Sequence, residues 1–177
     1  MKKLKIVFLF AMLNAFISTS FAWNHSLEIG AGISHDPNNT RYNNYGLLIS
    51  GDIFPLKRTA HYFWSIGGAL GQWHTNSPQH KNLTTIAIPL SLRYYLGELH
   101  CYPAYVFGSV GPAYMSSRQF GKNKQASNLS GQWNLGVGAE FHKIDLNLRF
   151  QHFSNAHLGS PDQGFSVLYL LSIGYLF

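Results

Sequence analysis

A histidine and a serine two positions apart, His152 and Ser154, are the pair in this 177-residue sequence best suited to covalent chemistry. A serine hydroxyl is a weak nucleophile until a neighbouring base takes its proton, and histidine can do this near neutral pH. Asn155 follows directly, and its amide could stabilise the oxyanion that forms when a serine attacks a carbonyl carbon. The three residues therefore predict a candidate acyl-transfer site. Histidine and serine also occur at a lipid headgroup boundary without a catalytic role, and the spacing alone leaves that interpretation open.

The segment that carries this pair has the alternating pattern of a β-strand. From Ile144 to Ser154 the even positions begin with four apolar residues, and the odd positions begin with four polar ones. Because successive side chains of a strand point to opposite faces, His152 and Ser154 continue the apolar face. Polar groups on an apolar, membrane-facing surface cost free energy, so they are functional candidates by default.

Seven other segments alternate in a similar way, and together the eight predict an all-β chain. They cover residues 27–34, 45–54, 61–73, 83–96, 103–115, 132–141, 144–154 and 165–177. Their number is even, and each approaches the length of about 9–11 residues that a tilted transmembrane strand needs. We therefore predict an eight-stranded antiparallel up-and-down transmembrane β-barrel with its apolar side chains outside. A barrel of this size is filled by its own side chains, which argues against a porin.

The N-terminus predicts export. Three lysines precede an apolar run over residues 6–17, and small residues follow at Ser20 and Ala22. This pattern predicts a signal peptide over residues 1–22 and a barrel over residues 23–177. The signal peptide would remove three of the 13 Lys and Arg residues, so the net charge of +6 makes no case for a nucleic-acid partner.

Two further features favour a barrel with an apolar exterior over a water-soluble barrel with an apolar interior. The polar strand faces carry charges that could pair in a lumen, such as Glu140, Asp145 and Arg149. The chain ends in Phe177 after alternating apolar residues, which resembles the C-terminal signal of outer-membrane proteins. Cys101 is the one cysteine, so no intramolecular disulfide can form.

The connections between the segments alternate in length. Short links are expected at residues 55–59, 97–102 and 142–143, and long ones at residues 36–44, 74–82, 116–130 and 155–164. Outer-membrane barrels have short periplasmic turns and longer external loops. We therefore expect both termini on the periplasmic side, and His152 and Ser154 near the external boundary.

The run from His152 to Ala156, one loop before the C-terminal strand, resembles the motif of the lipid A 3-O-deacylase family. The resemblance covers essentially the whole predicted barrel in length, strand number and motif position. It implies an esterase that hydrolyses the acyl chain at the 3 position of lipid A in the outer leaflet, with no metal or other cofactor. By this resemblance Ser154 is the nucleophile, His152 the general base and Asn155 an oxyanion contributor. The implied partners are lipopolysaccharide and outer-membrane lipids, and a homodimer is left open.

The sequence departs from the family at the third catalytic position, where the family has a glutamate at the start of the last strand. Counting forward from the motif, this position is Ser166; counting back from the C-terminus, it is Val167. Neither is a carboxylate, and Asp162 is the one acid after Ser154. We therefore name Ser166 and Asp162 as candidates for orienting His152.

Three basic residues in the third long loop, Arg118, Lys122 and Lys124, are candidates for contacting the lipid A phosphates. They could equally be ordinary solvated loop charges. The departure at the acid position also supports a second interpretation, a non-catalytic outer-membrane barrel with a structural or surface-interaction role. A palmitoyl-transferring barrel is a third, weaker alternative.

Overall fold

The computed structural model describes residues 25–36, 39–99, 102–155, 159–161 and 163–177. The predicted signal peptide, Cys101 and Asp162 lie outside the described residues. The strands are β1 (Ser26–Asp36), β2 (Asn39–Arg58), β3 (Tyr62–Thr75), β4 (Asn82–Ala87), β5 (Leu90–Leu99), β6 (Tyr102–Met115), β7 (Gln119–Phe120), β8 (Asn123–Lys124), β9 (Leu129–Phe141), β10 (Ile144–Ser154) and β11 (Phe165–Leu176). No helix within the described ranges is long and apolar enough to cross a membrane.

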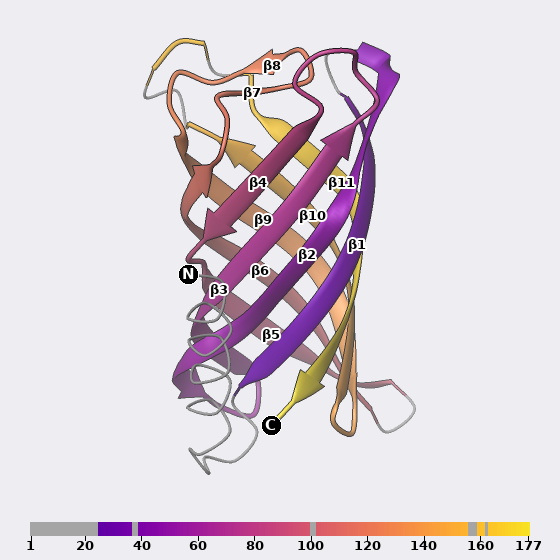
Figure 1. The fold of residues 1–177 in the computed structure, drawn as a ribbon. Helices are drawn as coiled ribbons and strands as arrows, with labels where there is room; N and C mark the ends of the chain where they lie inside the picture. Colours follow the sequence, from indigo (N-terminus) through magenta and orange to yellow (C-terminus); the bar gives the residue numbers. More distant parts are fainter. Residues whose placement is uncertain (1–24, 37–38, 100–101, 156–158, 162) are drawn as a thin grey trace, which may run out of the picture.

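The long strands form one antiparallel sheet that closes on itself (Figure 1). Closure is made by β11, which returns to pair with β1 and sets Leu176 opposite Ser26. β4 and β5 are two halves of one wall strand, since both lie between β3 and β6. The strand is interrupted at Pro89, which has no N–H to donate to a ladder. The wall therefore has eight strands, and the predicted up-and-down barrel is confirmed.

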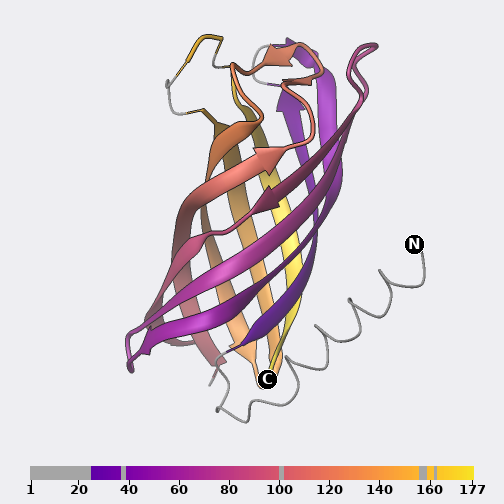
Figure 2. The ribbon, with the colours of Figure 1, turned by 60° about the vertical axis from the view of Figure 1, so that its left-hand side comes forward.

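The two ends of the barrel differ (Figures 1 and 2). The small hairpin β7–β8 lies at what we call the loop end, and the C-terminal Phe177 lies at the opposite, turn end. The prediction of a loop over residues 36–44 is wrong. The β1–β2 ladder continues through a register shift between His35 and Asp36, so β2 already begins at Asn39.

The outer wall is apolar along each strand, and the side chains that face the lumen are polar toward the turn end. On β10, Leu148 is 44% exposed on the outer wall while Asp145, facing the lumen, is fully buried. A band of exposed apolar side chains around the whole wall suits hydrocarbon rather than water, and it is the pattern of transmembrane barrels. The prediction of apolar side chains outside is therefore confirmed, and the predicted polar interior is found toward the turn end.

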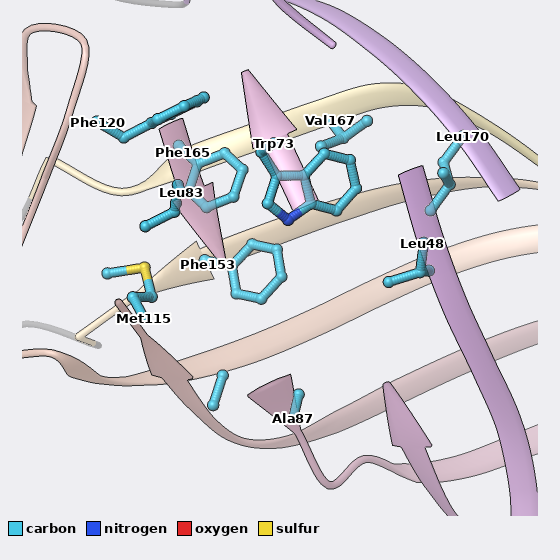
Figure 3. Close-up of a cluster of buried hydrophobic side chains, with 11 residues drawn as sticks. Leu48, Trp73, Leu83, Ala87, Met115, Phe120, Phe153, Phe165, Val167 and Leu170 are labelled. Atoms are coloured by element: carbon cyan, nitrogen blue, oxygen red, sulfur yellow. The ribbon is translucent and has the colours of Figure 1, made fainter. Parts of the chain in front are cut away.

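Toward the loop end the lumen is filled by an apolar cluster (Figure 3). Its aromatic centre is formed by Trp73, Phe153 and Phe165. The rings of Phe153 and Phe165 stack at a centroid distance of 4.7 Å and an interplanar angle of 8°. Phe153 lies between His152 and Ser154 in the sequence, so this stack anchors the end of β10 from inside.

Toward the turn end the lumen is charged. The guanidinium of Arg93 lies 2.9–3.5 Å from four carboxylate groups. These belong to Glu28, Asp52, Glu140 and Asp145. Arg149 forms a second ion pair with Glu28. The expected pairing of lumenal charges is thus present, and a cavity of about 30 Å³ beside it has room for little more than a water molecule.

A β-bulge in β11 changes which residues of the last strand face outward. Arg149 of β10 pairs with Leu170, but Gln151, two residues later, pairs with Val167, three residues earlier on β11. The extra residue reverses the alternation. Unbroken alternation back from Phe177 would turn Val167 outward, but Val167 lies in the apolar cluster at 1% exposure, because the bulge places it on the lumenal side.

Candidate active site

His152 and Ser154 are the last two outward-facing residues of β10. The burial pattern of the strand alternates to its end, and both side chains are half-buried on the outer face, between buried residues that face the lumen. The strand ladder sets His152 between Trp133 of β9 and Ser166 of β11. The structure therefore places the two side chains on one face of one strand, as the period-two pattern predicted.

The imidazole of His152 has a defined polar partner. Its Nδ1 lies 2.8 Å from the hydroxyl oxygen of Ser166. The bulge in β11 makes this contact, because it turns Ser166 outward and Val167 inward. Of the two ways to count to the family's acid position, the forward count reaches the residue that contacts the imidazole.

Aromatic rings enclose the imidazole on its strand and on β9. The ring of Phe150 is nearly parallel to it, at 6.4 Å and 6°, and the ring of Trp133 is tilted at 5.6 Å. These contacts restrict the rotation of the His152 side chain. Trp133 and His152 lie 19 positions apart in the sequence, and their contact follows from the pairing of β9 with β10.

Gly164, just before β11, leaves the space that the imidazole occupies. A Cβ atom at this position would lie 2.9 Å from Cε1 and 3.0 Å from Nε2 of His152, and 2.6 Å from the carbonyl oxygen of Phe153. Contacts this short exclude any side chain without a shift of the histidine. In the sequence, the one sign of this role is that a glycine, Gly164, stands directly before the last strand.

Asn155 is buried just beyond the end of β10, and its backbone N–H and side-chain amide both bind groups in the neighbouring loops. Its backbone N–H donates to the side-chain oxygen of Gln125 over 3.1 Å, and its Nδ2 donates to the carbonyl of Gly159 over 3.0 Å. The carbonyl of Ser154 accepts a hydrogen bond of 2.7 Å from the Ser130 hydroxyl. Sequence reasoning missed both Gln125 and Ser130, since loop glutamines and serines carry no spacing signal.

An apolar groove of about 480 Å³ opens beside the end of β10. It is lined by Gly111, Pro112, Ala126, Ser127, Leu129, Ser130, Gly131, Asn155 and Gly159. Gly131 is the cross-strand neighbour of Ser154, and a Cβ there would touch one atom, the Ser154 carbonyl oxygen at 3.4 Å. The missing side chain at this outward-facing position leaves the wall hollow next to the serine.

The three basic candidates lie at the loop end in the segment that contains β7 and β8. All three side chains are exposed, and the Arg118 Nε donates to Asn128 over 3.2 Å. The backbone of Lys124 forms two hydrogen bonds with Gln163, which lies between Ser154 and β11. The basic segment is thus attached to the loop that follows the candidate site. Within the described ranges, no cluster of His, Cys, Asp or Glu side chains could hold a metal ion.

The fold and the site define a class: an eight-stranded barrel with a lipid-type outer wall that carries a histidine and a serine on that wall. A family model described as lipid A 3-O-deacylase (PagL) matches residues 43–175. The chain therefore belongs to the lipid A 3-O-deacylase (PagL) family, whose members are outer-membrane barrels.

The fold of one solved outer-membrane enzyme agrees with this assignment. The crystal structure of the outer membrane enzyme PagL is similar with a TM-score of 0.64 at 18% sequence identity, over 85% of this chain and 98% of that one. The Yersinia pestis outer membrane protein Ail, in a phospholipid bilayer nanodisc, gives a TM-score of 0.49 at 13% identity, over 88% and 99%. A search of curated proteins found no match.

Proposed function

We propose that this chain is an outer-membrane esterase that hydrolyses the 3-O-linked acyl chain of lipid A, with Ser154 as nucleophile and His152 as general base. Membership of the deacylase family supports the reaction. The observation that carries the assignment to these residues is the contact between His152 Nδ1 and Ser166, on the outer face beside Ser154. An imidazole held through Nδ1 can direct Nε2 to the serine.

The reaction proceeds in two halves. With Nδ1 donating to the Ser166 hydroxyl, Nε2 takes the proton of Ser154 while the serine oxygen attacks the ester carbonyl carbon. The tetrahedral intermediate collapses, the bond to the 3-hydroxyl oxygen of the sugar breaks, and His152 returns the proton to that oxygen. Water, activated by His152, then hydrolyses the acyl-serine and releases the fatty acid. In both halves the second hydrogen of the Asn155 Nδ2 group, beside the one that binds the Gly159 carbonyl, is the proposed donor to the oxyanion.

The groove beside Ser154 supplies a place for the acyl chain. The lining of the groove is largely apolar and includes Pro112 and Leu129. The groove comes nearest to Ser154 at Gly131, where a side chain is missing. An acyl chain lying there would bring its ester carbonyl to the end of β10. The reacting bond would then lie at the depth of the barrel wall near the loop end, and the sugar and phosphates would lie above it.

The direct test is the mass of lipid A in cells that express the chain. We expect wild type to remove one 3-hydroxy fatty acid from lipid A, and Ser154→Ala to abolish that loss at equal barrel abundance. Identical lipid A from both strains would refute the enzyme assignment. The remaining interpretation would then be the non-catalytic barrel. It is favoured if the Ser166 hydroxyl donates to Nδ1 of His152, because Nε2 then carries the proton and cannot accept one from Ser154.

The basic segment at the loop end provides the proposed contact with the lipid A phosphates. We expect the triple variant Arg118→Ala, Lys122→Ala, Lys124→Ala to raise KM for bisphosphorylated lipid A about tenfold, and to raise KM for dephosphorylated lipid A less. The matched control removes Lys57 and Lys143, two exposed lysines toward the turn end, and should leave both constants unchanged. Equal KM values for all three proteins would show that these are ordinary solvated charges.

A further inference from the structure

The peptide bond between Ser154 and Asn155 is held by side chains at both of its polar atoms. Its carbonyl oxygen accepts the hydrogen bond from Ser130, and its N–H donates to the side-chain oxygen of Gln125. Both side chains are buried, with 6% exposure for Ser130 and 7% for Gln125. Hydrogen bonds in such a setting are costly to break, because the peptide groups would be left without water.

This peptide lies where the strand ladder stops. Ser154 is the last residue of β10, and its pairing with Gly131 is the last pair between β10 and β9. Asn155, the next residue, lies outside the strand ladder, and strand ends without such support open locally at low cost. The side chains of Ser130 and Gln125 therefore fix the backbone at the candidate nucleophile, as the ladder hydrogen bonds fix the rest of the strand.

Gln125 is itself held in place by the loop it belongs to. Its backbone N–H donates to the Arg118 carbonyl over 2.7 Å. The carbonyl of the preceding residue, Lys124, accepts from the Gln163 N–H over 2.9 Å, and the Lys124 N–H donates to the side-chain oxygen of Gln163 over 3.0 Å. Phe120 of the same loop packs on Phe165 in the lumenal cluster, at a centroid distance of 5.2 Å. The loop is thus tied to both segments that flank the site.

We infer that Gln125 and Ser130 are positioning residues that fix the Ser154 backbone and so place its hydroxyl for proton transfer to His152. The inference rests on the proposed function. The two residues act through the peptide and do not touch the substrate carbonyl. Displacement of a reacting group by about 1 Å can cost about 100-fold in rate, so loss of either hydrogen bond should lower kcat.

The experiment compares four variants of the full barrel with wild type and Ser154→Ala on purified lipid A in micelles. Gln125→Met and Ser130→Ala remove the hydrogen-bonding atoms, whereas Gln125→Glu and Ser130→Thr keep them. Gln119→Met is the matched control, since Gln119 lies in the same loop and its amide binds the Gly121 carbonyl. Gel migration before and after heating reports whether each barrel has folded.

We expect Gln125→Met and Ser130→Ala to lose at least tenfold in kcat with KM within twofold of wild type. Gln125→Glu and Ser130→Thr should recover most of that loss, and Gln119→Met should stay within twofold of wild type. A purely structural role would move the folded fraction and leave kcat per folded barrel unchanged, which would overturn the inference. So would an equal loss in Gln119→Met. An inactive wild type would overturn the proposed function together with the inference, whereas an active wild type with unaffected variants would overturn the inference alone.

Discussion

At the scale of single residues, the site differs from a carboxylate-assisted one in how firmly it selects a histidine tautomer. A carboxylate only accepts hydrogen bonds, so it keeps the proton on Nδ1 and leaves Nε2 able to accept. The Ser166 hydroxyl, 2.8 Å from Nδ1, can donate or accept. In a serine protease, replacing the orienting carboxylate by an amide lowers kcat by about 10⁴, chiefly through the wrong tautomer. The Ser166 contact therefore predicts an enzyme slower than one in which a carboxylate holds Nδ1 of the histidine.

This difference predicts a gain of function. Ser166→Glu should raise kcat for lipid A deacylation at least tenfold, because an acceptor-only group would hold the productive tautomer. Ser166→Gln has the same shape without the charge, can donate as well as accept, and should show no such gain. Steady-state release of fatty acid from lipid A measures both. A Ser166→Glu protein that folds and is no faster than Ser166→Gln would contradict the tautomer argument.

At the scale of elements, the bulge in β11 and the hollow on β9 shape the site. The bulge turns Ser166 outward and buries Val167. On β9, Gly131 interrupts a row of large outward side chains between Leu129 and Trp133. The two features lie on the strands flanking β10, one supplying the partner of the histidine and the other the space next to the serine.

Filling the hollow on β9 should block the acyl site without disturbing the barrel. A Cβ at Gly131 meets only the Ser154 carbonyl oxygen at 3.4 Å, so the backbone tolerates a side chain there. We expect Gly131→Leu to fold normally and to lower kcat/KM for lipid A at least tenfold, with Gly131→Ala in between. Leu135→Met, at another outward-facing position of β9, serves as a control for altered wall packing. Unchanged turnover in Gly131→Leu would show that the acyl chain lies elsewhere.

At the scale of the whole molecule, the lumen is divided into an apolar half and a charged half. The apolar half lies behind the site and is built around the Phe153–Phe165 stack. The charged half is organised by Arg93, which neutralises carboxylates from β1, β2, β9 and β10. Strands distant in the sequence are thus connected through one guanidinium group.

Removal of that guanidinium should destabilise the barrel severely. Arg93→Met leaves several buried carboxylates without their main partner, and breaking a buried ion pair from one side costs about 3–5 kcal/mol. Arg58→Met is the control: Arg58 is 38% exposed and 3.7 Å from Glu140, so its loss should cost less than about 1 kcal/mol. Urea unfolding in lipid vesicles compares the two. Similar stabilities for both variants would mean that the network does not hold the barrel together.

The sequence predicted the barrel well because alternation is a direct consequence of a wall with lipid outside and polar groups inside. It placed His152 and Ser154 on the outer face, and the structure agrees. The sequence could not show which of Ser166 and Val167 faces outward. A bulge adds one residue to a strand without changing its composition, so the residues of β11 are compatible with both alternations.

The loop contacts were beyond sequence reasoning for a different reason. Gln125 and Ser130 reach the Ser154–Asn155 peptide only because a loop folds across the end of the barrel and pairs with Gln163. Nothing in the spacing of these residues encodes that contact. Gly131 and Gly164 act by having no side chain, so their roles become visible only when the neighbours of the missing atoms are known.

The central claim, that His152 activates the Ser154 hydroxyl on the outer wall, is tested most directly by covalent labelling. Purified barrel in micelles is treated with an alkyl fluorophosphonate, and the labelled residue is located by peptide mass spectrometry. We predict a single adduct on Ser154 that forms at least 100-fold more slowly in folded His152→Ala. An adduct on another residue, or equal labelling of Ser154 with and without His152, would contradict the account.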